Sequence, residues 1–294
     1  MSLTLSKKNT IYIACPANTA TGGPELLHQL FSKLRELDFN VKIYYYNCSS
    51  QNPVHEQFIG YTPEYVDKIN DEKNNVLIVP EVATEILTGF RNISKVIWWL
   101  SVDNFFNSYK IKKIFYGILF NLNNKKNQKK TLENSEKIKM RNKYNYYYKL
   151  NFKNDNSIIH FVQSYYAYLF LKRENVNNIY FLSDYINPEF INNQLNKSNL
   201  QKENIALYNP NKGYFFTKKL IKCYPDINWI PLINLKRNEM SNLLLKAKVY
   251  IDFGEHPGKD RIPRESAISG CCVITGLKGS AKYHNDVPIK LDYK

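Results

Sequence analysis

The feature of this sequence that most constrains its fold is a regular alternation between short β-rich runs and longer amphipathic segments. Six runs rich in Val, Ile, Tyr and Trp precede residue 183. The segment 24–37, between the first two runs, repeats Leu and Phe every three or four residues, which gives a helix one apolar face. Such alternation favours a parallel sheet covered by crossover helices. The predicted strands of this half are 11–15, 41–45, 76–79, 96–100, 158–163 and 178–182.

A second alternating series begins after residue 188, so we predict a domain boundary near residue 186. A chain of 294 residues suits two domains of ordinary size. We therefore predict an α/β fold of two Rossmann-like domains, 1–185 and 186–294, each a parallel sheet with helices on both faces, and a cleft between them. The predicted strands of the second domain are 205–208, 228–231, 249–253 and 272–275, and its helices are 214–223, 237–247 and 262–269.

Positive charge is concentrated in one segment. The formal net charge is +15, and residues 110–153 alone hold 13 Lys or Arg against two acids, a net charge of +11. The Lys, Asn and Tyr of this segment interrupt the alternation, so we interpret it as an insertion with partial helix. Such a block attracts nucleic acid, anionic lipid or a polyanionic substrate, and charge alone does not choose among them.

Two other properties bear on where the protein works. No run reaches the roughly 18 apolar residues that cross a bilayer, and the first ten residues are polar, which predicts a cytoplasmic protein. The five cysteines are odd in number, scattered and without a Cys-x-x-Cys pair, which fits neither a disulfide framework nor a zinc site. We expect reduced thiols, most of them in the core.

The first candidate motif lies between the first strand and the first helix. Gly22 and Gly23 follow Thr21 and precede Pro24 there. Glycines at a helix start let backbone N–H groups approach an anion such as a phosphate. The segment lacks the Gly-x-Gly-x-x-Gly pattern of dinucleotide sites. The alternative is a tight turn that needs glycine for its backbone angles.

The second and strongest motif, residues 252–265, joins a predicted strand to a helix that Gly270 ends. Ligands of doubly wound sheets bind outside the carboxyl ends of strands, where this loop lies. Its basic side chains, Lys259, Arg261 and Arg264, are suited to neutralise a diphosphate. Glu265, early in the helix, is suited to accept hydrogen bonds from two ribose hydroxyls. The alternative is a charged, solvated helix start.

A third motif, 208–213, follows the first strand of the second domain. Lys212 is a candidate for the donor diphosphate, and the alternative is a plain turn built from Asn, Pro and Gly. His256, inside the second motif, is either a donor contact or a turn residue that forms local hydrogen bonds. Across the predicted cleft, Gly22 and Gly23 would face Lys212 and the basic loop.

On these motifs the chain resembles the GT-B glycosyltransferases of family 4. The resemblance runs from the Gly22-Gly23 loop to the passage 249–275 and is most specific in the second motif. Members of that family have a helix-starting Glu that binds the donor ribose, and Glu265, followed by Ser-Ala-Ile-Ser-Gly, matches it. They also have a second Glu eight positions earlier, but Pro257 stands there in this chain. The resemblance also implies further strand and helices after residue 289, so we expect the second domain to be incomplete.

The resemblance implies transfer of a sugar from a nucleotide-sugar to an acceptor hydroxyl, with retention, in surface polysaccharide or glycolipid synthesis. Cationic and backbone donors stabilise the leaving diphosphate, so no metal or other cofactor is required. The implied catalytic residues are Glu255, Lys259 and Arg261, with Asp260 the alternative to Glu255 in the place of the missing second Glu. The implied donor-binding residues are Gly22, Gly23, Lys212, His256, Gly258, Asp260, Arg264 and Glu265.

On the acceptor side we expect His28 and Asp103, with His28 a base only if the cleft reaches it. The segment 110–153 would then bind the inner face of an anionic membrane that carries a lipid-linked acceptor, and no nucleic acid is expected. The alternatives are a nucleic-acid-binding protein that uses this segment, or a non-catalytic scaffold that binds nucleotide-sugar. His160, Trp98 and Trp99 are predicted to fill the core.

Overall fold

The computed structural model describes residues 5–48, 51–107, 155–196 and 201–294, and the basic segment 110–153 lies outside this range. The chain forms two compact units. The first comprises Met1–Gln163 with Ala167–Leu182, and the second comprises Ser164–Tyr166 with Ser183–Lys294. The chain therefore passes into the second unit close to the boundary expected near residue 186. The cleft expected between the domains stays a prediction.

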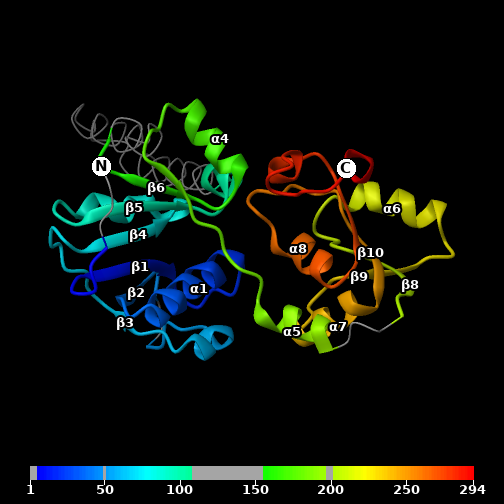
Figure 1. The fold of residues 1–294 in the computed structure, drawn as a ribbon, viewed down its shortest axis with the longest axis horizontal. Helices are drawn as coiled ribbons and strands as arrows, with labels where there is room; N and C mark the ends of the chain where they lie inside the picture. The colour runs from blue at the N-terminus through cyan, green and yellow to red at the C-terminus, as the bar shows by residue number, and fades with distance from the viewer. Residues whose placement is uncertain (1–4, 49–50, 108–154, 197–200) are drawn as a thin grey trace, which may run out of the picture. The chain divides into compact units, whose positions relative to one another are not determined.

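The first unit is built on a seven-stranded sheet in which every pair of neighbouring strands is parallel. The strand order is β3-β2-β1-β4-β5-β6-β7 (Figure 1). The chain adds β2 and β3 on one side of β1 and then β4 to β7 on its other side, so the order of addition reverses between β1 and β4. The strands are β1 (Thr10–Pro16), β2 (Asn40–Tyr46), β3 (Tyr65–Val66), β4 (Val76–Pro80), β5 (Ser94–Trp99), β6 (Ile159–Val162) and β7 (Ile179–Phe181).

Helix α1 (Gly22–Glu36) shows why this half folds as predicted. Its apolar face buries Leu27 and Phe31, which are about 1 % exposed, against β1 and β2. The five central residues of β1 are all buried, as expected of a strand covered on both faces. The predicted parallel sheet is confirmed. Among its described residues, this unit also contains the helical segment 102–107, most of α4 (Tyr165–Arg173), and two 3-10 segments, η1 (Glu56–Tyr61) and η2 (Glu81–Gly89).

The second unit has a four-stranded parallel sheet in the order β11-β10-β8-β9. Right-handed crossovers fix which face each helix covers. Helix α6 leads from β8 towards the β9 edge of the sheet, whereas α7 and α8 lead from β9 towards the β11 edge. Helix α6 therefore lies on the opposite face from α7 and α8 (Figure 1). The elements are α5 (Pro188–Asn196), β8 (Glu203–Tyr208), α6 (Tyr214–Cys223), β9 (Asn228–Pro231), α7 (Arg237–Lys246), β10 (Ala247–Asp252), α8 (Arg261–Ile268), β11 (Cys272–Thr275), η4 (Gly279–Lys282) and η5 (Leu291–Tyr293).

The predicted core residues of the first unit are buried. Trp98 and Trp99 are 2 % and 0 % exposed. The indole N–H of Trp99 donates to Nδ1 of His160 at 3.1 Å, and burial lowers the pKa of His160 to about 4. His160 is therefore a neutral core residue, as predicted.

The prediction for the cysteines was partly wrong. All five are free thiols, but only Cys15 and Cys271 are buried. Cys48, Cys223 and Cys272 are exposed, because each lies at the end of an element or on the solvent side of one. Among the described residues, no helix combines the length and the hydropathy that crossing a bilayer requires.

The loops that follow β8 and β10 are held together by two glycines. Gly213 has a φ of +63°, and a Cβ there would lie 2.4 Å from the backbone carbon of Phe253. A Cβ on Gly254 would lie 2.3 Å from Cβ of Lys212. Only residues without a side chain allow this approach, which fixes the position of the Lys212 backbone.

We predict that Gly254→Ala destabilises the second unit by more than about 1 kcal/mol, because the added methyl group overlaps Lys212 and one of the two loops must move. Gly276→Ala is the matched control, since its Cβ would make ordinary contacts of 3.5 Å or more with Phe253. Thermal unfolding of both variants measures the difference. Equal melting temperatures would show that the loops are not tightly packed.

Candidate functional site

The candidate site of the second unit lies where two neighbouring parallel strands end. Lys212 follows β8, and Asp252 is the last residue of β10. Because the strands are parallel neighbours, their carboxyl ends meet at one edge of the sheet, where ligands of such sheets bind. The loop from Asp252 to Asp260 then leads into α8.

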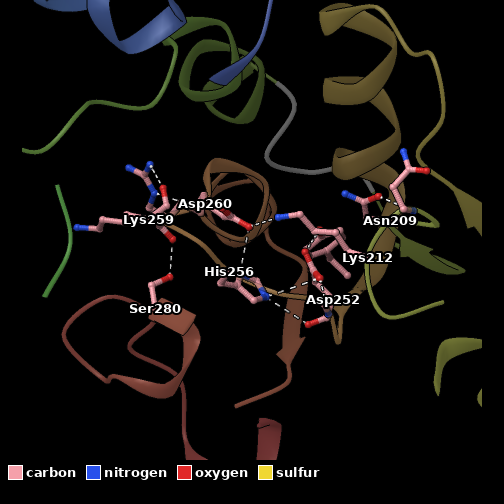
Figure 2. A network of polar contacts seen from close by, with 12 residues as sticks. Asn209, Lys212, Asp252, His256, Lys259, Asp260 and Ser280 are labelled. Atoms are coloured by element: carbon pink, nitrogen blue, oxygen red, sulfur yellow. Dashed lines mark hydrogen bonds and ion pairs between the residues drawn. The ribbon is translucent and has the colours of Figure 1, made fainter. Parts of the chain in front are cut away.

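Four side chains at this edge form a continuous polar network (Figure 2). The ammonium of Lys212 donates to Oδ2 of Asp260. The same oxygen lies 3.2 Å from Nδ1 of His256, whose other ring nitrogen lies 3.6 Å from Oδ1 of Asp252. His256 is fully buried and Asp252 is 2 % exposed. Two cationic groups and two carboxylates thus alternate in a largely dehydrated setting.

The network shifts the protonation of its members. Burial lowers the pKa of His256, but the carboxylate of Asp260, which accepts from the ring, and the charge of Asp252 outweigh it, so the pKa lies above its ordinary value. Burial raises the pKa of Asp260, but His256 and Lys212 outweigh it and the pKa lies below its ordinary value. The geometry therefore favours a protonated His256 between two carboxylates.

Tyr250 and Gly254 hold the buried end of the network in place. The hydroxyl of Tyr250 donates to Oδ2 of Asp252 at 3.0 Å, and the backbone N–H of Gly254 donates to Oδ1 at 3.0 Å. Burial and the nearby charge of Asp252 raise the pKa of Tyr250 well above its ordinary value. Both oxygens of Asp252 are therefore engaged within the protein.

Asp252, His256 and Asp260 are also of the residue types that hold metal ions, and one ligand atom from each lies within 4.8 Å of the others. The donor set fits a cation poorly in this arrangement. Lys212 already bonds to Asp260, while Tyr250 and Gly254 bond to Asp252. The ammonium of Lys212 supplies the positive charge that a metal would bring.

The first turn of α8 carries positive charge where helices ordinarily carry negative charge. Arg261 and Arg264 lie in this turn, which contains no acidic residue. The positive end of a helix dipole disfavours cations there. Asp260 is the N-cap, yet its carboxylate makes no capping hydrogen bond, because it faces Lys212 and His256 instead. The helix start thus joins the N–H groups of Arg261 and Ile262, which the Asp260 side chain does not cap, to basic side chains, whereas Pro263 has no N–H. This arrangement is suited to an anion.

Arg264 and Lys259 contact the segment that precedes α5. The guanidinium of Arg264 donates to both carboxylate oxygens of Asp184, at 2.9 and 2.8 Å, and to the carbonyl of Lys259 at 3.2 Å. The ammonium of Lys259 lies 3.5 Å from the hydroxyl of Ser183. The charge of Arg264 is therefore balanced within the protein, and Arg264 acts here as a structural link.

The remaining residues expected in this half differ in exposure. Glu265 is 4 % exposed, and its negative charge contributes to the raised pKa of Tyr250. Glu255 is exposed and forms a 3.0 Å ion pair with Lys278. Gly258 is buried, and its carbonyl accepts a hydrogen bond from the hydroxyl of Ser280 at 2.5 Å (Figure 2). The structure thus brings Lys212, His256 and Asp260 together. Glu265 lies close enough to Tyr250 to act on its pKa, and Glu255 pairs with Lys278 instead.

In the first unit, Gly22 and Gly23 begin α1, two residues earlier than predicted. Neither has a positive φ, so the tight turn that would require glycine is absent. A Cβ on Gly22 would meet nothing within 4 Å, and one on Gly23 would lie 3.8 Å from Leu100. The glycines therefore leave open space at the helix start, at the carboxyl end of β1.

The geometry does not support His28 as an acceptor-side base. His28 is 1 % exposed, and its ring nitrogens lie 2.7 Å from the carbonyl of Pro24 and 2.7 Å from the hydroxyl of Tyr45. Its ring stacks on Phe58, and burial lowers its pKa. Asp103, the other acceptor-side candidate, lies partly exposed in the helical segment 102–107, just after β5.

The sequence analysis missed several buried carboxylates, among them Asp184 and Glu81. Asp184 carries the contact with Arg264 described above. Glu81 follows β4 at the reversal of the first sheet, is 3 % exposed, and accepts a hydrogen bond from the N–H of Leu100 at 2.9 Å. Burial raises the pKa of Glu81 to about 8. Its place directly after an apolar strand is a signal that could have identified it.

The two parallel sheets with their helices define the class of protein, because the chain has the GT-B fold of glycosyltransferases. Family models and curated protein sequences give no match to this sequence. Among solved structures, the chain resembles WaaG, a glycosyltransferase involved in lipopolysaccharide biosynthesis, with a TM-score of 0.50 and 11 % identity over 95 % of this chain and 84 % of that one.

Two further structures have the same fold. Sucrose-phosphate synthase of Thermosynechococcus elongatus gives a TM-score of 0.53 and 11 % identity, with 92 % of this chain and 82 % of that one covered. Anabaena Alr3699/HepE, solved in complex with UDP-glucose, gives a TM-score of 0.50 and 7 % identity, with coverages of 93 % and 82 %. At these identities the similarity establishes the fold.

We predict that His256→Gln destabilises the protein more at pH 6 than at pH 9. The raised pKa of His256 means that its stabilising contribution is complete below its ordinary pKa and is lost as the pH rises through the raised value. The lowered pKa of Asp260 keeps that carboxylate charged at both pH values. The destabilisation by His256→Gln should be larger at pH 6 than at pH 9 by about 1.4 kcal/mol for each unit by which the pKa is raised.

Denaturant unfolding of wild type and variant at both pH values measures this effect. His284→Gln is the control, because His284 is an exposed histidine of the same unit. A His256→Gln penalty that does not change with pH would mean that His256 is neutral in the folded protein.

Proposed function

We propose that this protein is a glycosyltransferase that transfers a sugar from a nucleotide-sugar to an acceptor hydroxyl. The observation that carries the proposal is the start of α8, where basic side chains and uncapped N–H groups stand at the carboxyl edge of a parallel sheet. This arrangement suits the diphosphate of a nucleotide-sugar. The GT-B fold supports the same function, and HepE, a protein of that fold, binds UDP-glucose.

In this proposal Lys259 and Arg261 bind the diphosphate together with the N–H groups of α8. Negative charge grows on the diphosphate as the sugar departs, and fixed positive groups stabilise that charge in the transition state more than in the ground state. Lys212 joins them when it exchanges part of its contact with Asp260 for a phosphate oxygen. His256 then remains beside Asp260 and keeps that carboxylate compensated.

Glu265 is the proposed partner of the donor ribose, and Gly22 and Gly23 are further proposed donor-binding residues. Glu255 is the proposed group beside the transferred sugar, which requires it to leave its ion pair with Lys278. The reaction is proposed to proceed with retention and without a metal ion. The acceptor is proposed to be a glycan or a lipid-linked glycan at the inner face of a membrane.

The test is titration calorimetry with nucleoside diphosphates, followed by assay of sugar transfer from the corresponding nucleotide-sugars. We predict that Arg261→Ala raises the dissociation constant of the nucleoside diphosphate about tenfold or more, because a charge-assisted hydrogen bond to phosphate is lost. Lys246→Ala is the matched control, because Lys246 forms a surface ion pair with Glu203 at 3.7 Å. This variant should bind the nucleoside diphosphate as the wild-type protein does.

The outcomes separate the candidate functions. Absence of nucleotide binding by the wild-type protein, or equal binding by wild type and Arg261→Ala, would overturn the proposal. Binding without transfer would indicate the non-catalytic scaffold. Binding that is lost in EDTA and restored by a divalent ion would assign a metal to Asp252, His256 and Asp260.

A further inference from the structure

Helix α6 exposes large apolar side chains on a basic surface. Phe215 is 77 % exposed and Phe216 is 50 % exposed, whereas the only fully buried residue of the helix is Thr217. Tyr224, directly after the helix, is 57 % exposed. Soluble proteins seldom place adjacent phenylalanines in water, so this clustering calls for a partner.

The periodicity of the helix shows which way these groups point. Thr217 defines the side that faces the sheet, with Leu220 half-buried on the same side. Residues at i, i+4 and i+7 share one face of a helix, so Phe215, Lys219 and Lys222 form a row on the outer side. The ammonium of Lys219 lies 4.7 Å from the centre of the Phe215 ring, which confirms this row.

The charge of the outer side is entirely positive. Lys218 flanks the row, and α6 contains no acidic residue. Among the described residues, Lys218, Lys219 and Lys222 form no ion pair. By contrast, Lys212 and Arg264 of the same unit are paired with carboxylates. The lysines of α6 are therefore available to an external anionic partner.

Among the described helices of the second unit, α6 lies apart from α7 and α8. Right-handed crossovers put α7 and α8 on the other face of the sheet, where α5 packs against both (Figure 1). On its own face, α6 is anchored by Phe216, whose ring meets that of Phe253 edge-on at 4.6 Å between centres. Phe216 thus ties the helix to the unit, whereas Phe215 points away.

We propose that α6 docks the second unit on an anionic lipid bilayer, with Phe215 inserted at the level of the head groups and Lys218, Lys219 and Lys222 bound to lipid phosphates. Aromatic rings prefer the bilayer interface, and lysines bind anionic head groups while their aliphatic stems cover apolar surface. This combination of aromatic and basic groups fits a lipid surface better than a protein partner, whose surface would have to be both acidic and apolar. The surface is distinct from segment 110–153 and needs no nucleotide.

The first test is cosedimentation with vesicles of phosphatidylcholine alone or of an equimolar mixture with phosphatidylglycerol, without nucleotide. We expect the wild-type protein to bind only the mixed vesicles. Lys218→Gln/Lys219→Gln/Lys222→Gln should lower the partition coefficient about a hundredfold, because each lysine near such a surface contributes about a fivefold factor. Lys8→Gln/Lys68→Gln/Lys73→Gln is the matched control, since it removes the same charge from exposed positions in the first unit.

The second test separates insertion from simple charge attraction. Phe215→Ser should lower binding about tenfold. Leu195→Ser is its control, because Leu195 is 72 % exposed on α5. In a matched pair of variants, brominated lipid chains should quench the fluorescence of a tryptophan placed by Phe215→Trp and leave that of Leu195→Trp unchanged.

Three results would overturn the proposal. One is equal vesicle binding by wild type and by both the Phe215→Ser and the triple lysine variants of α6. Another is equal quenching at positions 215 and 195. The third is a wild-type dimer that Phe215→Ser converts to a monomer without a change in vesicle binding, which would assign the surface to a second copy of the chain. Because no nucleotide is present, failure here leaves the proposed transferase activity untouched.

Discussion

The candidate site depends on the close contact between the loops that follow β8 and β10. Gly213 and Gly254 face each other across this contact, and neither position has room for a side chain. The contact puts Lys212 within reach of Asp260, although 48 residues separate them in the sequence. Asp260 in turn lies beside His256, which extends the network to Asp252.

The network explains how so many charges are tolerated at a buried edge. An isolated carboxylate or imidazolium in this setting would suffer a large desolvation cost. Alternation of Lys212, Asp260, His256 and Asp252 compensates each charge with a neighbour of opposite sign.

Cationic residues that are alike in the sequence differ in their carboxylate partners. Lys212, Lys259, Arg261 and Arg264 are all cations of the loops at one sheet edge. Arg264 is bound by Asp184 and links the helix start to the preceding segment. Lys212 is bound by Asp260, and Arg261 is the first residue of α8. Similar cations thus hold different places at one edge of the sheet.

The sequence by itself determined the class of fold. The predicted strands lie within a residue or two of those in the structure, because apolar strands covered on both faces leave a continuous pattern that needs no knowledge of their neighbours. The two-residue strand β3 and the short 3-10 helices were not predicted, since segments of this length are defined by packing and not by periodicity. Gly270, with a φ of +81°, ends α8 as the sequence indicated.

Only the tertiary structure decided which candidate side chains meet. His28 was expected to be an acceptor-side base only if the cleft reached it, but Tyr45 and the carbonyl of Pro24 occupy both of its ring nitrogens. Asp184 and Glu81 gave no motif, yet both are buried carboxylates with defined partners. Local patterns encode helices and strands because those depend on near neighbours. The charge state and the contacts of a site depend on residues brought together from distant parts of the chain. Local sequence patterns do not predict the spatial distances between such residues.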